Sequence, residues 1–417
     1  MNGLGLFVLG SLVAIFLLRR VAELLSLRAL RRPVPPDLAH LYPPELYARV
    51  QGYAARRTRL SLLGSSVELL LLLLFWFAGG FGVLDEAVRT ATSSPLLAGL
   101  LFLGLLALAG ELASLPFQVW SVFWIEEEYG FNRTTIGTFL LDHLKSWALG
   151  AVLGGVLLAL LLELFLRLGP SAWLVCWGGV ILLLPLLQLV VPRLVLPLFH
   201  RFTSLPAGEL RDAIADYAAR QRFPLADIHV VDGSRRTSRA NAFFTGFGRT
   251  RRVALFDTLL TGHSLPEVVA VLAHEIGHSR RGHQLKGMLL AMVQTGLLLF
   301  LLSLIVESRP LAEAFWLSGP SVHAGFALFG LLFSPLELLL GIGLRWLSRR
   351  WEFEADRFAA ETTGSPAPLL AALEKLAASG LNHPAPHPLL VLLTSSHPPL
   401  GPRLAALRRL PSTSAPA

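Results

Sequence analysis

The sequence predicts an all-α polytopic membrane protein that carries a small α+β insert between its fifth and sixth membrane helices. Three observations lead to this fold class. The 417 residues are 53% hydrophobic and only 15% charged, whereas a soluble domain carries about 25% charge. The mean hydropathy is +0.59. Seven apolar runs approach the roughly 20 residues that a helix needs to cross a bilayer.

The apolar runs follow one another along the chain with polar loops between them. The first run is not expected to be a cleaved signal peptide, because Arg19 and Arg20 follow it and no basic residue precedes it. Several runs contain a glutamate, such as Glu111, which should face protein or water because a carboxylate in lipid is costly. The expected spans are residues 3–18, 61–83, 96–120, 147–168, 171–192, 287–306 and 324–347.

The arginines predict the orientation of these spans. Nine arginines lie in residues 19–60, whereas the loops 84–95 and 307–323 carry one each. Cytoplasmic loops are enriched in basic residues, so we expect the N-terminus outside and the C-terminus and both polar segments in the cytoplasm. The net charge of +8 therefore reflects topology, and nucleic acid is not an expected partner.

The segment between Pro192 and Leu285 has the composition of a soluble domain. Its periodicity predicts an amphipathic helix over 207–222 and strands over 227–232, 240–248 and 251–257, the last two joined as a hairpin. Ser264-Leu-Pro-Glu267 is a capping box with proline in the first turn, which predicts the start of a helix. This helix runs through VVAVLAHEIGHSRR (268–281), which contains most of the polar stretch VLAHEIGHSRRGH (271–283).

The HEIGH motif has the spacing of a zinc-hydrolase helix. His274 and His278 are four residues apart, so both imidazoles can bind one ion. Glu275 lies about 100° round the helix, beside the ion, where it can exchange a proton with a zinc-bound water. With 12 histidines in the chain, a chance HExxH is expected in roughly one such chain in a hundred.

A hydrolytic zinc site needs a third protein ligand. Arg281 and Gln284 stand where a metzincin pattern would have glycine and histidine. His283 is expected to serve as a polar wall or helix end. Helical periodicity after the seventh span makes Glu352 a candidate ligand, with Asp356 as the acceptor for a ligand histidine. The alternative is a solvated helix end in which Arg349 and Arg350 pair with glutamates.

At this point the chain resembles a known family, the integral-membrane zinc endopeptidases of the type 1 CAAX prenyl protease family, which are gluzincins. The resemblance covers nearly the whole chain in order. The blocks that carry it are HEIGHSRRGH, SRRWEFEADRFA (348–359), RANAFFTGFGRTRRVALFDTLL (239–260), HPLLVLLTSSHPPLGPRLAAL (387–407), LPFQVWSVFWIEEEYGFNRTT (115–135) and VLPLFHRF (195–202).

The resemblance implies a role for each matching residue. It makes His274, His278 and Glu352 the ligands of one Zn²⁺ per chain, Glu275 the general base and acid, and Asp356 a support of the site. It also implies an edge strand that pairs with substrate, a C-terminal pair of donors for the substrate carbonyl or a carboxylate, and a seven-helix barrel round a water-filled chamber. The strand residues are Asn241, Ala242 and Phe243, and the donors are His397 and Arg403.

These inferences predict a zinc metalloendopeptidase with three parts. Residues 1–200 form a membrane domain of about five spans, 201–411 a metallopeptidase domain that includes the last two spans, and 412–417 a flexible tail.

The expected partners are the bilayer and peptide or membrane-protein substrates, prenylated or not, and a monomer is compatible with the sequence. The scarcity of lysine favours a bacterial source and hence the inner membrane. The alternative function is a transporter or channel with a structural or regulatory zinc site.

Overall fold

The computed structural model describes residues 1–245 and 251–411. The expected turn at 248–250, the end of the strand 240–248 and the expected flexible tail 412–417 lie outside this range. Within it the helices are α1 (Gly3–Ala29), α2 (Pro44–Phe77), α3 (Gly80–Ala91), α4 (Pro95–Trp120), α5 (Ile136–Leu149), α6 (Gly155–Leu168), α7 (Ala172–Val190), α8 (Leu196–Phe199), α9 (Glu209–Arg220), α10 (Asp257–Gly262), α11 (Leu265–Arg280), α12 (His283–Ile305), α13 (Arg309–Ala314), α14 (Val322–Leu332), α15 (Ser334–Thr363), α16 (Ala367–Ser379), α17 (Pro388–Thr394) and α18 (Leu400–Arg408).

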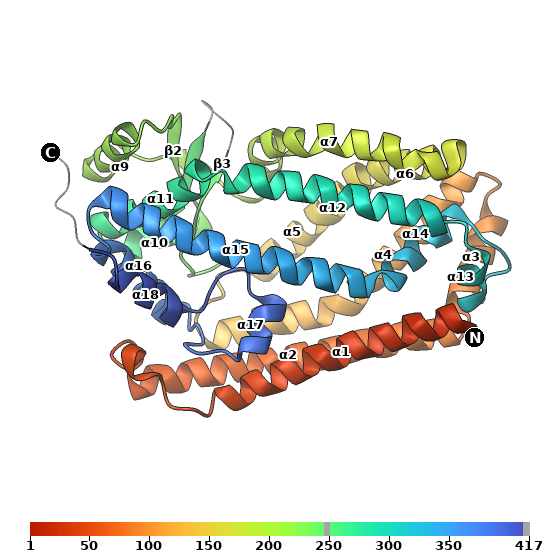
Figure 1. The fold of residues 1–417 in the computed structure, drawn as a ribbon, viewed down its shortest axis with the longest axis horizontal. Coiled ribbons are helices and arrows are strands. Elements are labelled where there is room, and N and C mark those ends of the chain that lie inside the picture. Colours follow the sequence, from red (N-terminus) through yellow and green to blue (C-terminus); the bar gives the residue numbers. More distant parts are fainter. Residues whose placement is uncertain (246–250, 412–417) are drawn as a thin grey trace.

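The long helices lie along the longest axis of the molecule, with the polar insert and the C-terminal helices at one end and the N-terminus at the other (Figure 1). By length and hydropathy, five helical runs of the described chain are able to cross a membrane, and a bent pair makes a sixth. One of the five, Ile136–Phe199, contains both α6 and α7. These two helices are joined by a short turn at Gly169–Ser171 and lie side by side (Figure 1).

Two expected spans differ from the helices in the structure. The run 61–83 is interrupted, because α2 ends at Phe77 and Gly79, in the left-handed region at φ 76°, starts α3 in a new direction. The run 324–347 is bent by 56° at Phe333, where Pro335 in the first turn of α15 cannot donate to α14. Hydropathy counts apolar residues and does not register such breaks.

The insert contains four short strands, β1 (Phe202–Ser204), β2 (Asp227–Val231), β3 (Ala242–Thr245) and β4 (Arg252–Phe256), in the order β1-β2-β4-β3. The three expected strands are confirmed within the described residues. Strand β1 was missed, because three residues are too few to display an alternating pattern. Strands β2 and β4 are parallel, and β3 pairs antiparallel with β4.

One edge of this sheet is formed by β3. The backbone N–H of Phe256 donates to the Asn241 carbonyl, and Phe243 stands opposite Ala254. In an antiparallel ladder, only every second residue of an edge strand bonds to the partner strand. The residues between them direct their backbone N–H and C=O groups away from it. The backbone groups of Ala242 and Phe244 therefore face the free edge.

The core of the insert forms where α11 packs on β3 and on the neighbouring helices α9 and α16. Its largest fully buried side chains include Ile214 and Tyr217 of α9, Leu255 of β4, and Leu272 and Ile276 of α11. The apolar face of α11 is buried in this core. Its opposite, polar face is thereby directed towards α15 and the C-terminal helices.

Candidate metal centre and active site

Helix α11 begins as the sequence predicts. The backbone N–H of Ser264 donates to Glu267 Oε2 at 2.9 Å, and the reciprocal contact from the Ser264 side chain completes the capping box. Glu267 also contacts Lys375 Nζ of α16 at 2.8 Å, which ties the start of the helix to its neighbour. The cap therefore sets the rotation at which α11 presents His274, Glu275 and His278.

Helix α15 passes close to α11 at Gly277. A Cβ atom at this position would lie 3.1 Å from Ala355 Cα and 3.1 Å from Phe358 Cδ1, closer than side chains normally approach. The glycine in HEIGH thus permits a backbone separation that brings Glu352 and Asp356 under the two histidines. The alternative of a solvated helix end is wrong for these carboxylates, because Glu352 is 3% and Asp356 2% exposed.

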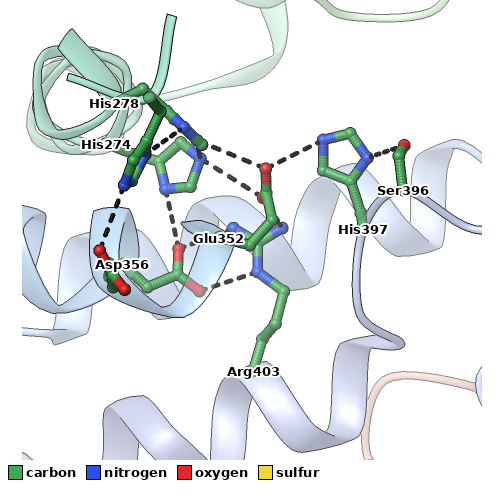
Figure 2. A network of polar contacts seen from close by, with 9 residues as sticks. His274, His278, Glu352, Asp356, Ser396, His397 and Arg403 are labelled. Carbon is green, nitrogen blue, oxygen red and sulfur yellow. Dashed lines mark hydrogen bonds and ion pairs between the residues drawn. The ribbon is translucent and has the colours of Figure 1, made fainter. Parts of the chain in front are cut away.

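Three side chains converge on one point (Figure 2). His274 Nε2 and His278 Nε2 are 3.2 Å apart. They lie 3.6 Å from Glu352 Oε2 and 3.4 Å from Glu352 Oε1, respectively. Ligand atoms about 2.0–2.1 Å from one tetrahedral ion are about 3.4 Å apart, so this spacing fits zinc.

The donor set also fits a metal chemically. All three ligand atoms lie within 4.8 Å of one another, and Glu352 Oε2 is buried without a hydrogen bond from any described residue. One proton between the two facing imidazole nitrogens satisfies both of them but leaves Glu352 Oε2 without a donor. A divalent cation satisfies both lone pairs and the carboxylate at once.

A salt-bridge network supports this group from below (Figure 2). Asp356 Oδ1 lies 2.8 Å from His274 Nδ1, a hydrogen-bond distance, although the ring N–H is poorly aligned with the oxygen. Arg403 of α18 donates to both oxygens of Asp356, from Nε at 2.8 Å and from Nη2 at 2.7 Å. Its Nη1 lies 3.4 Å from Glu352 Oε2. Arg403 thus neutralises two buried carboxylates.

Glu275 faces a cavity of about 150 Å³ beside this group. Burial raises the pKa of its carboxyl above the ordinary 4.5, and the neighbouring histidines oppose that shift. A carboxylate with a raised pKa is a better proton acceptor at neutral pH. The predicted site residues that line the cavity are Asn241, Ala242, His274, Glu275, Glu352, His397 and Arg403.

The remaining predicted residues lie as follows. His397 points its Nε2 at Glu352 Oε1, at 3.3 Å, and its Nδ1 at Ser396 Oγ, at 2.9 Å. With a side chain 64% exposed, it is open to a ligand. Phe243 does not line the cavity and packs instead near Phe256, with ring centroids 6.2 Å apart. Arg403 lines the cavity, but its main partners are Asp356 and Glu352.

Sequence reasoning missed the surroundings of His283. This residue begins α12, where its Nδ1 lies 3.0 Å from His278 Nδ1 and its Nε2 lies 3.2 Å from Glu354 Oε2. It does stand at a helix end, as expected, but it also contacts a metal-ligand candidate and a carboxylate. An unbroken helix would have turned His283 away from His278, and the glycine at 282 was the one available signal that the helix breaks.

The fold and the site together define a class of protein, the integral-membrane metallopeptidases. Comparison with known proteins narrows this class. A family profile described as CAAX prenyl protease N-terminal, five membrane helices, matches residues 23–201, and one described as Peptidase family M48 matches residues 204–410.

Relatives extend over almost the whole chain. The CAAX prenyl protease 1 homolog of Arabidopsis thaliana is 31% identical over 409 residues, 96% of each chain. The CAAX prenyl protease 1 homolog of Homo sapiens is 31% identical and covers 90% of this chain and 89% of its own. The crystal structure of S. mikatae Ste24p matches with a TM-score of 0.90 and 30% identity, over 98% of this chain and 99% of that chain.

The chain belongs to peptidase family M48, in the branch of the CAAX prenyl protease 1 homologues. It is an integral, multi-pass membrane protein and a zinc-dependent metalloendopeptidase. This assignment favours the protease over the alternative of a transporter or channel with a structural zinc site.

Proposed function

We propose that the chain hydrolyses peptide bonds of membrane-associated, CAAX-type substrates at a zinc held by His274, His278 and Glu352. The observation that carries this proposal is the convergence of two imidazole nitrogens and a buried carboxylate within 4.8 Å. The bound zinc supplies Lewis-acid polarisation of the water and of the substrate carbonyl. Every other part of the reaction falls to side chains of this chain.

Glu275 is the proposed general base and acid. It takes a proton from the attacking water as the oxygen bonds to the carbonyl carbon, and returns this proton to the amine nitrogen as the C–N bond breaks. The second water proton also passes to the nitrogen, so the products are a carboxylate and a protonated amine. The raised pKa of Glu275, which burial causes, suits both transfers because the protonated carboxyl is then a usable acid near neutral pH.

Asp356 and Arg403 are proposed to hold the ligands in position, and His397 to donate to the oxygen of the scissile carbonyl. His397 suits this role because its side chain is largely exposed at the cavity. Arg403 is the weaker donor to substrate, since its nitrogens already contact Asp356 and Glu352.

The free edge of β3 is the proposed substrate cradle. The Ala242 carbonyl and the outward backbone groups of Phe244 are able to pair with an extended peptide, whereas the Ala242 N–H already donates to Asn241 Oδ1 at 2.9 Å. Asn241 and Ala242 border the cavity that contains Glu275. Such β-augmentation contacts the backbone of the peptide, so it accepts substrates of many sequences. The substrate class rests on the names of the relatives, CAAX prenyl proteases. If the source is bacterial, unprenylated membrane proteins become substrates as well.

For the membrane region we propose seven spans that enclose a water-filled chamber, with the active site on the cytoplasmic side and, in a bacterium, in the inner membrane. Counting α6 and α7 separately and the bent pair α14 and α15 as one gives seven. A cavity of about 1550 Å³ between α4, α5 and α6, mostly apolar but bordered by Glu111 and His143, supports the chamber. We also propose a domain division between residues 200 and 201, which the limits of the two family profiles, 23–201 and 204–410, support.

The test uses the purified full-length chain in detergent. Zinc is measured by elemental analysis, and cleavage of a farnesylated CAAX peptide and of an unmodified membrane peptide is followed for the wild type and for Glu275→Ala. We expect one zinc per chain in both proteins and a loss of about 10²–10⁴-fold in rate for the variant. Sub-stoichiometric zinc in the wild type, or equal turnover by the variant, contradicts the proposal.

A further inference from the structure

His278 has a second partner that the metal group itself does not use. Its Nε2 faces His274 Nε2 and Glu352 Oε1, so its Nδ1 points the opposite way. There it meets Nδ1 of His283 at 3.0 Å. Behind His283, Glu354 Oε2 lies 3.2 Å from Nε2. Glu354, His283 and His278 thus form a row of contacts that ends at the metal group.

The protons of this row have one arrangement that satisfies every contact. When Nε2 of His278 binds a metal, the neutral ring carries its proton on Nδ1 and needs an acceptor. The Nδ1 lone pair of His283 is that acceptor, and the proton of His283 then sits on Nε2, directed at the Glu354 carboxylate. Reversing either ring leaves two protons or two lone pairs facing each other.

The ring of His283 is held firmly enough to act in this way. His283 is 4% exposed. Its ring lies on the indole of Trp351 at a centroid distance of 4.9 Å and an interplanar angle of 9°. Gly282, at φ 68°, lets the chain reverse after α11, so that His283 starts α12 beneath His278.

The two ligand histidines are consequently supported in parallel. His274 has Asp356 Oδ1 at 2.8 Å from its Nδ1, whereas His278 reaches Glu354 through the ring of His283. A carboxylate behind a ligand imidazole fixes its tautomer and orientation and raises its basicity. His283 is not a ligand itself, because it contacts His278 from the side opposite the metal group.

We propose that His283 and Glu354 are positioning residues that orient His278 and set its metal affinity. The inference rests on the proposed role of His278 as a zinc ligand and deepens it. It assigns the last histidine of HEIGHSRRGH a function through His278. Removing the ring nitrogens of His283 should therefore weaken zinc binding while the fold is retained.

The experiment compares zinc affinity, by chelator competition, in four forms of the full-length protein. His283→Phe keeps a ring on Trp351 and removes both nitrogens, and Glu354→Gln removes the terminal charge. Arg350→Gln is the matched control, because Arg350 Nε also contacts Glu354, at 3.7 Å, without touching His283. We expect about a 10–100-fold loss for His283→Phe, a smaller loss for Glu354→Gln and none for Arg350→Gln.

A second readout separates positioning from mere packing. The visible absorption of Co²⁺ substituted for zinc should change in His283→Phe, whereas the unfolding temperature of the chelated protein should not. Wild-type zinc affinity in a folded His283→Phe overturns the inference. If that variant fails to fold, wild-type affinity in Glu354→Gln overturns it instead.

Failure of the proposed function has a different signature. In that case the wild type itself lacks one tightly bound zinc, or His278→Ala retains it. A wild type that binds zinc and a His278→Ala variant that loses it, together with unchanged affinity in His283→Phe, would contradict the positioning role alone.

Discussion

At the scale of single residues, the site is a balance of buried charges. Glu352 and Asp356 are nearly inaccessible to solvent, and a buried carboxylate without a partner is costly. Arg403 contacts both of them, and the histidines contact them from the other side. Helix α15 therefore tolerates two buried carboxylates because a guanidinium contacts them on one side and imidazoles contact them on the other.

Removing Arg403 should destabilise the fold, because the buried carboxylates depend on its charge. Arg403→Gln leaves Asp356 buried without its bidentate partner, and breaking such a pair from one side costs about 3–5 kcal/mol. Thermal unfolding of the full-length chain measures the change. Arg350→Gln, which removes a partly exposed pair, should change stability by at most about 1 kcal/mol. Equal stability of the two variants would falsify the charge-balance account.

Zinc affinity should depend on pH through His278. Burial tends to lower the pKa of this imidazole, but the contact with the Glu352 carboxylate outweighs burial and raises the pKa above 6.5. A protonated imidazole cannot bind zinc. Affinity should therefore begin to fall, as pH decreases, at a pH above that expected for an unperturbed histidine. Chelator competition at a series of pH values measures this, and an affinity that stays constant until well below pH 6.5 contradicts it.

The stability of the metal-free protein should change with pH in the direction opposite to zinc affinity. A raised pKa in the folded state means that the protonated His278 stabilises the fold. This contribution is fully present below the unfolded value of 6.5 and is lost as pH rises through the raised pKa. Unfolding of the chelated enzyme as a function of pH measures it. Glu352→Gln, which lacks the charge, should show a smaller dependence.

At the scale of elements, two glycines decide how the helices that carry the site meet. Gly277 permits the close approach of α11 to α15, and Gly282 permits the reversal between α11 and α12. Neither glycine carries chemistry. Each removes a steric obstacle, and together they bring Glu352 and His283 to the two histidines of α11.

Gly282→Ala tests the reversal. No atom of a described residue lies within 4 Å of the added Cβ, so we expect the effect to come from the left-handed backbone. We expect a loss of about 1–2 kcal/mol in stability and weaker zinc binding, because His283 shifts. Gly282→Asn is the matched control, since asparagine adopts this conformation more readily. Thermal unfolding and chelator competition measure both variants, and equal effects of Ala and Asn count against the explanation.

At the scale of the whole molecule, the insert is fastened to the membrane helices by ion pairs and by the proposed metal. Arg236 donates to both oxygens of Asp142 in α5, from Nε at 2.8 Å and from Nη2 at 3.0 Å. Arg239 contacts Glu126 at 3.2 Å, near the end of the long helix that begins with α4. These pairs hold β3 and its flanking loop against the membrane region, while the metal would join α11 to α15.

Removal of zinc should therefore lower the stability of the whole molecule. A ligand present at 1,000 times its dissociation constant stabilises the folded state by about 4 kcal/mol. The unfolding temperature of the wild type should fall on chelation and recover when zinc is returned. Glu352→Ala, which lacks a ligand, should unfold at the same temperature with and without chelator. A wild type that is insensitive to chelation would show that the metal does not join the two helices.

The amino-acid sequence by itself determined the features that depend on neighbouring residues. Hydropathy located the apolar part of each membrane helix but not the ends of several helices. The capping box at Ser264 located the start of α11, and the spacing of His274 and His278 predicted two ligands on one face. These are local properties, because helix periodicity and hydrophobic runs require no knowledge of the remaining chain.

Only the tertiary structure decided what lies next to α11. The sequence left Glu352 open between a ligand and a solvated helix end, and it gave no reason to connect Glu354 to His278, 76 residues away. The bend at Phe333 and the path of the chain after Gly282 were not predicted, although a proline and a glycine mark these positions, since both geometries depend on how helices pack. Contacts between distant segments arise from packing over the whole fold, and a short stretch of sequence does not encode them.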